Sequence, residues 1–512
     1  MSGTDSARFA ELQRKMVTVH AAWRAGHGRR TMVVVPSRTI DKWHEPPAES
    51  RALEERLLCL LLMLHDPGLR IVYVTSSPLP EAIIDYYLSL LLPRALRRSA
   101  RDRLTLVSVG DDSTRPLSEK LLERPHVLRE IRRAIPEHEL CHFVPYATTD
   151  LERDLALALE APMYGADPRH RDLGTKSGSR RLFAHAAVPH PLGVERVADT
   201  REVIGAIEWL RAAKPEIAHV VVKLDEGVSG AGNATIDLRG LPLPGEPDER
   251  ERITERLGRM TVEASGVSAD AFLAKLSVRG GIVEERITGR EVRSPSVQLE
   301  VTPAGDVAIV STHDQVLGGH NGHSYRGCRF PADPAYAGAI TALAGRVGRR
   351  LADAGVIGRC AVDFVVMCDD SGRWHPYAIE LNLRKGGTTH PFATLEQLTG
   401  GTYDAEAAAF TTPAGTRKHY VASDHLASPS LRRLGQAGLL DLMKRRRLGF
   451  DRARHSGVVF HMLSALDPLG RVGLTAVGDT PDEAQRRFEH ARVVLLLAAA
   501  GQAGRRMAAP AL

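Results

Sequence analysis

Residues 361–391 read AVDFVVMCDDSGRWHPYAIELNLRKGGTTHP, a pattern of two largely apolar strands around a polar turn. Ala361–Met367 contains the β-branched and aromatic residues of a strand, and Trp374–Asn382 resumes this character after a short break. The break, Cys368–Gly372, is rich in the Asp, Ser and Gly residues that form turns. We therefore predict an antiparallel hairpin over this stretch.

The predicted hairpin carries a cluster of oxygen ligands. Glu380 and Asn382 share one face because side chains on a strand repeat every two residues, and Asp363 joins them if the strands pair in register. Carboxylate and amide oxygens of this kind hold Mg²⁺ against nucleotide phosphates. Arg384, two residues further on, would reach a transferring phosphoryl group or a developing oxyanion. The alternative is a set of surface charges at a strand edge.

Two lysines stand in contexts that suit phosphates. The chain contains 10 Lys against 58 Arg, so lysines in such places are a stronger signal than usual. Lys223 ends a strand and leads into the glycine-rich segment DEGVSGAGN, whose backbone N–H groups can cover phosphates. Lys176 begins a helix in GTKSGSRRLF. The loop residues that we expect at the nucleotide are Gly227, Ser229, Gly230 and Gly232. An ordinary hairpin loop and a solvent-exposed lysine are the alternatives.

A third segment, IVEERITGRE over residues 282–291, reads as a strand that turns at Gly289. Extended backbone of this kind can present a carbonyl and an N–H to an adenine edge while a carboxylate accepts the ribose hydroxyls. The nucleotide-binding candidates here are Glu284, Glu285, Ile287 and Glu291. A surface hairpin with charged edges is the alternative.

Taken in chain order, these segments resemble the ATP-grasp superfamily. The E-x₆-E spacing of Glu284 and Glu291 is similar to that family's hinge and ribose pair, and E-x-N-x-R over residues 380–384 resembles its carboxylase-like branch. The wider layout, including residues 311–331, is similar to the pheganomycin-type peptide ligases. One departure is the Leu that follows Lys223, where many relatives have Pro.

The resemblance implies a mixed α/β and α+β architecture. An N-terminal α/β domain over residues 1–165 would precede an ATP-grasp domain over 166–412, with its lid subdomain at about 195–285, and a small C-terminal α/β domain would occupy 413–512. The residues themselves support the N-terminal α/β domain. Strand-like runs at 31–36, 71–76 and 104–109 alternate with helical sequence, which predicts a parallel sheet covered on both faces.

The activity implied by the resemblance is an ATP-dependent carboxylate–amine ligase in peptide secondary metabolism. An acyl phosphate would form and an amine would displace phosphate, releasing ADP and phosphate. ATP and two Mg²⁺ are expected as cofactors. Asp363, Glu380 and Asn382 would hold the metal, and Lys223 and Arg384 would be the catalytic groups. The alternatives are an ATP-grasp kinase or carboxylase that forms no amide, and a nucleic-acid-associated or regulatory protein with a vestigial nucleotide site.

Substrate contacts are expected after the second glutamate of the hinge and in the loop STHDQVLGGHNGHSYRGCRFP. The candidates are Arg293, Tyr325 and Arg326, together with His390 in the segment RKGGTTHP. His320 and His323, with Cys328 nearby, leave a zinc site as an alternative to a substrate-facing loop, but structural zinc needs four ligands and no second spaced pair is visible.

The net charge of +6 invites comparison with nucleic-acid-binding proteins. The basic run at 444–447 lacks interleaved stacking aromatics, so we expect a solvated helix end, small-molecule acid and amine substrates, and no nucleic-acid partner. The longest apolar runs, 57–64 and 493–500, fall far short of the roughly 20 residues of a membrane helix. Five scattered cysteines and a polar start predict a cytoplasmic protein, and a homo-oligomer stays open.

Overall fold

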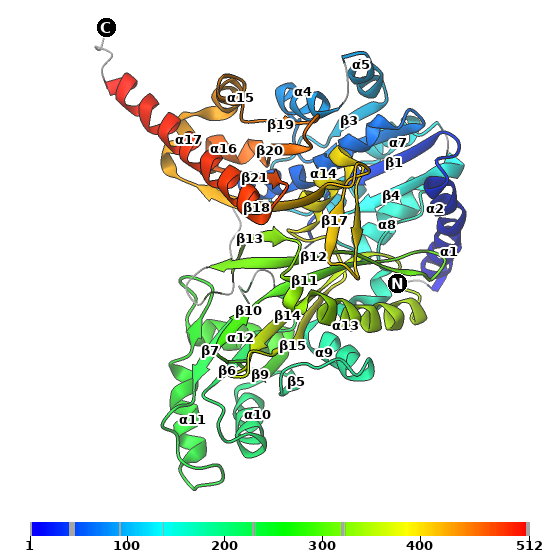
Figure 1. Ribbon diagram of the computed structural model, residues 1–512. Coiled ribbons are helices and arrows are strands. Elements are labelled where there is room, and N and C mark those ends of the chain that lie inside the picture. Colours follow the sequence, from blue (N-terminus) through cyan, green and yellow to red (C-terminus); the bar gives the residue numbers. More distant parts are fainter. Residues whose placement is uncertain are drawn as a thin grey trace.

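The computed structural model describes residues 3–39, 47–91, 94–136, 138–227, 230, 232–318, 322 and 324–507. Their strands form a four-stranded, a five-stranded and a twelve-stranded sheet. In Figure 1 the N-terminal part (blue to cyan) and the C-terminal part (orange to red) lie side by side, and the five-stranded part (green) projects away from both.

The N-terminal sheet is parallel throughout, with the order β3-β2-β1-β4, which confirms the predicted arrangement. Val33 and Val35 enter one core and Met32 and Val34 another, so alternate residues of β1 bury both faces of the sheet. The strands are β1 Arg30–Val35, β2 Leu69–Thr75, β3 Leu104–Ser108 and β4 Cys141–Pro145. The helices are α1 Gly3–Arg14, α2 Met16–Arg24, α3 Pro47–Glu54, the 3₁₀ helix η1 Glu55–His65, α4 Glu81–Leu90, α5 Arg94–Asp102, α6 Leu117–Leu122, α7 Pro125–Arg133, the 3₁₀ helix η2 His138–Leu140 and α8 Asp150–Leu159.

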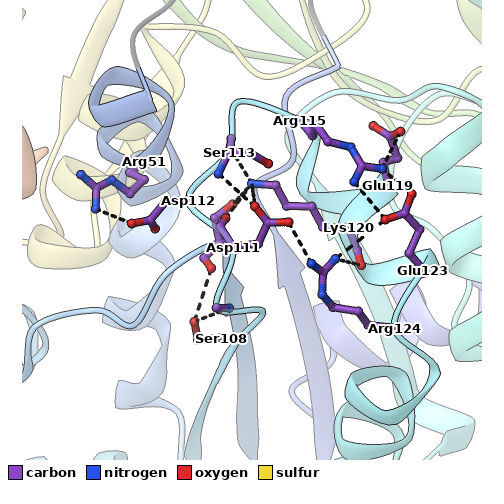
Figure 2. A network of polar contacts seen from close by, with 12 residues as sticks. Arg51, Ser108, Asp111, Asp112, Ser113, Arg115, Glu119, Lys120, Glu123 and Arg124 are labelled. Carbon is purple, nitrogen blue, oxygen red and sulfur yellow. Dashed lines mark hydrogen bonds and ion pairs between the residues drawn. The ribbon is translucent and has the colours of Figure 1, made fainter.

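A polar network closes the carboxyl edge of this sheet (Figure 2). Lys120 of α6 is fully buried, and its ammonium donates to the Asp111 carbonyl (2.8 Å), the Ser113 carbonyl (2.6 Å) and the Ser76 hydroxyl (3.1 Å). Arg124 adds a bond of 2.9 Å to the Asp111 carboxylate. This edge is where open parallel sheets bind anionic ligands, but here the three ammonium protons all have acceptors within the chain. The network therefore fixes the loop after β3 against α6.

The five-stranded sheet is ordered β5-β9-β6-β7-β8 and lies within residues 193–285, where the resemblance places a lid subdomain; the lid itself stays a prediction. Its core gathers Val203, Ile207, Val222 and Phe272 from the sheet and its helices. The elements are β5 Gly193–Val197, α10 Thr200–Ala213, β6 His219–Leu224, β7 Asn233–Asp237, α11 Glu249–Gly258, β8 Thr261–Val262, α12 Ala269–Arg279 and β9 Gly281–Glu285. The 3₁₀ helix η3 Pro168–Gly174 and the helix α9 Lys176–His185 precede it.

The strand pairs of the twelve-stranded sheet are antiparallel, and the sheet runs across the predicted boundary at 412, because β13 pairs with β18. The boundary itself stays a prediction. Its strands are β10 Glu291–Arg293, β11 Pro295–Val301, β12 Val307–Gly318, β13 Ser324–Phe330, β14 Gly358–Cys368, β15 Trp374–Asn382, β16 Thr402–Asp404, β17 Ala409–Thr411, β18 Arg417–Ala427, β19 Phe450–Asp451, β20 Ser456–His461 and β21 Arg471–Gly478. The accompanying helices are α13 Pro334–Asp353, α14 Thr389–Thr399, η4 Pro429–Arg433, α15 Gly435–Arg446, η5 Leu463–Ala465, α16 Leu466–Leu469 and α17 Pro481–Met507.

The basic run lies where the sequence predicted it, at a helix end. Lys444, Arg445 and Arg446 form the last turn of α15, and Arg447 follows with a positive φ of 53°. Cations in the last turn offset the partial negative charge at the carboxyl end of the helix. Among the described residues, no helix is both long and apolar enough to span a bilayer.

We expect His313 to make the fold sensitive to acid. His313 on β12 is buried, and burial lowers its pKa to about 3. An unfolded histidine titrates near its ordinary value of 6.5, so as the pH falls below 6.5 the unfolded chain gains a proton that the folded chain does not bind. In urea unfolding at pH 7 and pH 5, His313→Gln should lose less stability on acidification than the parent, by up to about 1.4 kcal/mol per pH unit. The exposed His126→Gln is the control, and an equal pH dependence for parent and His313→Gln would contradict this account.

Candidate active site

A cavity of about 1340 Å³ lies between the five-stranded sheet, the twelve-stranded sheet and the N-terminal part. Most of the residues that the sequence predicted for the site line this cavity. These are Lys176, Lys223, Gly227, Gly230, Glu284, Glu285, Ile287, Glu291, Arg293, Tyr325, Arg326, Asp363, Glu380, Asn382 and Arg384. Gly232 and His390 are not among the described lining residues, and Ser229, His320 and His323 lie outside the described part of the chain.

The predicted oxygen cluster is brought together by the hairpin of β14 and β15. Asp363 stands directly opposite Glu380, and a bulge between Asp363 and Phe364 sets this register. The Asn382 amide donates to Asp363 at 2.9 Å, which leaves the amide oxygen as a ligand. Gln315 of β12 donates to the other Asp363 oxygen at 3.1 Å.

The electrostatics of this cluster fit a divalent cation. Burial and the facing Glu380 carboxylate together raise the pKa of Asp363. Burial also acts against the charged form of Glu380, but the charges of Lys176, Arg384 and Lys223 outweigh it and hold its pKa below the ordinary value. Two carboxylates that repel each other at one point are stabilised by a cation between them, and all the ligand atoms are oxygens, as Mg²⁺ prefers.

Both predicted lysines lie beside this cluster and hold carboxylate partners. Lys176 begins α9 and its ammonium is 2.7 Å from Glu380. Lys223, near the end of β6, is 2.5 Å from Glu284, which Arg180 also contacts at 2.9 Å. The lysines are 5% and 6% exposed, so their charge acts at short range in a weakly screened site. The oxygens of an incoming phosphate would replace these carboxylates as partners of the two lysines.

Two close backbone approaches place Lys223 and the loop after it. A Cβ at Gly281 would lie 2.2 Å from the Lys223 carbonyl oxygen, so the β6–β9 pairing requires glycine at that position. A Cβ at Gly227 would lie 3.2 Å from the Gly232 Cα, which brings the two arms of the predicted phosphate loop together. The glycines of this loop therefore allow its shape, in addition to the contact with phosphate that we expect from them.

The segment expected at adenine and ribose divides into buried and exposed parts. The Glu285 carboxylate accepts from the Leu192 N–H at 2.9 Å and pairs with Lys214 at 2.6 Å, which ties β9 to the start of β5 and the end of α10. Glu291 on β10 is exposed and pairs with Arg293 at 2.6 Å. Its carboxylate is therefore accessible to a ligand at the cavity wall.

The predicted substrate contacts differ in position. Arg293 is held by Asp333 at 2.7 Å and stacks over Trp374 at 5.0 Å, so it forms part of the rigid wall. Tyr325 and Arg326 of β13 line the cavity. His390 is buried at the start of α14, 3.1 Å from Asp424, so the structure places it behind the wall.

Comparison with known proteins identifies the family. The chain is 30% identical over 481 residues to the L-propargylglycine–L-glutamate ligase of Streptantibioticus cattleyicolor, covering 91% of this chain and 94% of that one. The chain belongs to the pheganomycin-type ATP-grasp peptide ligases. The family description "IQCH-like, ATP-grasp" matches residues 170–263 and 252–406 of the ligase, and "PGM1 C-terminal domain" matches residues 432–491.

One further sequence match and two solved structures extend the comparison. IQ motif-containing protein H of Danio rerio is 24% identical over 482 residues, covering 84% of the ligase and 45% of that protein. The biotin carboxylase domain of Hydrogenobacter thermophilus 2-oxoglutarate carboxylase has a TM-score of 0.52 at 15% identity, with 91% and 90% covered. N5-carboxyaminoimidazole ribonucleotide synthetase has a TM-score of 0.51 at 10% identity, with 91% and 97% covered. The predicted ATP-grasp fold is thereby confirmed.

Part of the cavity wall of the ligase was not predicted from its sequence. Arg56 and Tyr146 come from the N-terminal part, and Asp424 and His425 from β18. No motif marks them, because they reach the site only through the packing of distant segments. Arg56 offers one signal, since it is a charged residue among the leucines of residues 52–64.

Proposed function

We propose that the protein joins the carboxylate of one amino acid or peptide to the amine of another, with ATP converted to ADP and phosphate through an acyl phosphate. The observation that carries this proposal is the meeting of Asp363, Glu380 and Asn382 with two lysines and Arg384 in one cavity. The match to an amino-acid ligase over 91% of this chain and 94% of that protein supports it.

The roles of the side chains follow from their charge and place. Lys176 and Lys223 would hold phosphate oxygens, and Arg384 would hold the γ-phosphate against the acceptor carboxylate, so that the reacting oxygen and phosphorus stay aligned. Asp363, Glu380 and Asn382 would hold two Mg²⁺, which when bound neutralise phosphate charge. No nucleophile from the chain is needed, because the substrate carboxylate itself attacks.

The acid and amine substrates are proposed to be small molecules of the amino-acid class, as in the name of the Streptantibioticus cattleyicolor relative. We place the reaction in the cytoplasm because it consumes ATP.

Product analysis tests this proposal. With pooled amino acids and Mg·ATP, we expect ADP, phosphate and an amide product in equal amounts, and a hydroxamate when hydroxylamine replaces the amine. Nucleotides would be separated by chromatography and condensed products found by mass spectrometry. AMP with pyrophosphate would contradict the acyl phosphate, and ADP without any amide or hydroxamate would indicate a kinase instead.

A further inference from the structure

Tyr146 lies at the cavity wall directly after β4, at the carboxyl edge of the N-terminal sheet. The carboxyl ends of parallel strands are where open α/β sheets place their ligand contacts. The Tyr146 carbonyl accepts from the Lys385 N–H at 3.2 Å, and the Lys385 side chain donates to the Pro145 carbonyl at 2.7 Å. The backbone of Tyr146 is thereby joined to the neighbour of Arg384, and both side chains line the same cavity.

The phenol of Tyr146 faces a guanidinium group. Arg56 of η1 donates to the Tyr146 hydroxyl at 3.2 Å. Within the described part of the chain, Arg56 is the only hydrogen-bond partner of this hydroxyl. A hydroxyl group carries one proton and two lone pairs, so a group in the cavity can exchange a proton with this oxygen.

Arg56 is itself fixed at the wall by a buried carboxylate. It pairs with Asp424, whose side chain is 2% exposed. The Asp424 carboxylate lies 3.1 Å from the His390 ring and 2.7 Å from the His461 ring. A guanidinium group held in this way keeps the Tyr146 oxygen in place, and its charge favours the ionised phenol. Arg56 therefore acts as a positioning residue for Tyr146.

Electrostatics separate Tyr146 from Tyr325, the other tyrosine among the described lining residues. Burial raises the pKa of Tyr146, but the charges of three guanidinium groups outweigh burial and bring its pKa below the ordinary value. These groups belong to Arg56, Arg384 and Arg38. Burial holds the pKa of Tyr325 well above the ordinary value, although Arg56 opposes this. A base is most effective when its pKa lies near the working pH, which favours Tyr146.

The proposed reaction needs such a base for the amine. An α-amino group is largely protonated at pH 7, and a protonated nitrogen has no lone pair with which to attack. The Asp363 and Glu380 carboxylates are assigned to the metal, and Asp424 is held in its ion pair. Burial lowers the pKa of His425 to about 4, so this ring is a weak base.

We propose that Tyr146 is the general base of amide formation, and that its phenolate oxygen takes a proton from the ammonium group of the amine substrate. This inference rests on the proposed function, because it requires an acyl phosphate beside Arg384. The nitrogen lone pair then forms the C–N bond, while the C–O bond to phosphate breaks and its electron pair leaves with the phosphate. A second proton passes from the nitrogen to the departing phosphate, and the phenol returns its proton to water.

A comparison of two nucleophiles tests this inference, because hydroxylamine is a weaker base than an amino acid and is largely unprotonated at pH 7. With pooled amino acids and Mg·ATP, Tyr146→Phe should lower amide formation by about 10²-fold at pH 7. Hydroxamate formation should stay at the parent rate. The loss of amide should shrink as the pH rises, because more of the amine is then unprotonated. Tyr377→Phe, half-buried on β15 and outside the cavity lining, is the matched control.

Arg56→Lys provides a second test that does not depend on the folding of Tyr146→Phe. Lysine keeps a positive charge for Asp424 but lacks the planar group that donates to the phenol. The pKa of Tyr146 should therefore rise, and the pH profile of amide formation should shift to higher pH. Hydroxamate formation should keep its parent profile.

Equal losses of amide and hydroxamate in folded Tyr146→Phe would overturn the inference, because Tyr146 would then act before the amine attacks. Parent rates of both products in this variant, or an unshifted pH profile in folded Arg56→Lys, would overturn it as well. The proposed function survives each of these results if the parent forms amide and hydroxamate. If the parent forms neither product, the proposed function falls and this inference falls with it.

Discussion

Glu380→Gln is expected to lower ATP-dependent product formation by about 10³-fold while the chain stays folded. Glu380 lies opposite Asp363 on the paired strand and 2.7 Å from Lys176, so it would contact both the proposed metal and the lysine that we propose binds phosphate. Glutamine keeps the size of the side chain but removes the charge that holds a divalent cation. Initial rates at saturating ATP and Mg²⁺ would measure the loss, and circular dichroism would check the fold.

The matched control for Glu380→Gln is Asp370→Asn. Asp370 is an exposed carboxylate in the turn of the same hairpin, so its replacement changes the net charge equally without touching the cavity. We expect parent activity from Asp370→Asn. Retained activity in a folded Glu380→Gln variant would remove Glu380 from the metal site.

Arg384→Lys is expected to lower kcat by about 10²-fold with little change in the KM for ATP. The guanidinium can bind two oxygens at once, on the phosphoryl group and on the acyl carboxylate, whereas an ammonium offers a single point of charge. Because Lys176 and Lys223 remain to bind the ground-state phosphates, the loss should fall on the chemical step. Steady-state rates over a range of ATP concentrations separate the two constants.

Arg373→Lys serves as the control for Arg384→Lys, since Arg373 is exposed on the hairpin turn and should tolerate the change. A rise in the KM for ATP at unchanged kcat would show that Arg384 only binds nucleotide. Such a result would contradict its assignment to the transition state.

The sequence predicted the hairpin of β14 and β15 because its signals are local. Strand residues, turn residues and alternation all lie within residues 361–382. It did not predict the bulge after Asp363, which sets the register that places Asp363 opposite Glu380. A bulge depends on the packing of both strands, and no single residue marks it.

The scarcity of lysine in the sequence is only weak evidence that a given lysine binds phosphate. Lys120 and Lys418 are also buried, and each donates to backbone carbonyls, with Lys418 2.7 Å from the Arg454 carbonyl oxygen. Burial of a scarce lysine therefore does not by itself indicate a phosphate. Lys418 also pairs with the Asp479 carboxylate, so Lys176 and Lys223 differ in that they and their carboxylate partners line the cavity.

The contact between Arg56 and Asp424 at the cavity wall could not have been predicted from local patterns. Arg56 of η1 and Asp424 of β18 are far apart in the chain and meet in an ion pair, next to α14, which packs against η1. Such contacts depend on tertiary structure, which a single sequence does not display.

The measurement that tests the central claim most directly follows oxygen from the acid substrate. With a carboxylate donor labelled with ¹⁸O, formation of an acyl phosphate and its displacement by the amine must leave one ¹⁸O atom in each phosphate released. Mass spectrometry of the phosphate would show it. Transfer of the label, together with ADP and the amide, is the result that we predict, and unlabelled phosphate beside a newly formed amide would contradict the proposed mechanism.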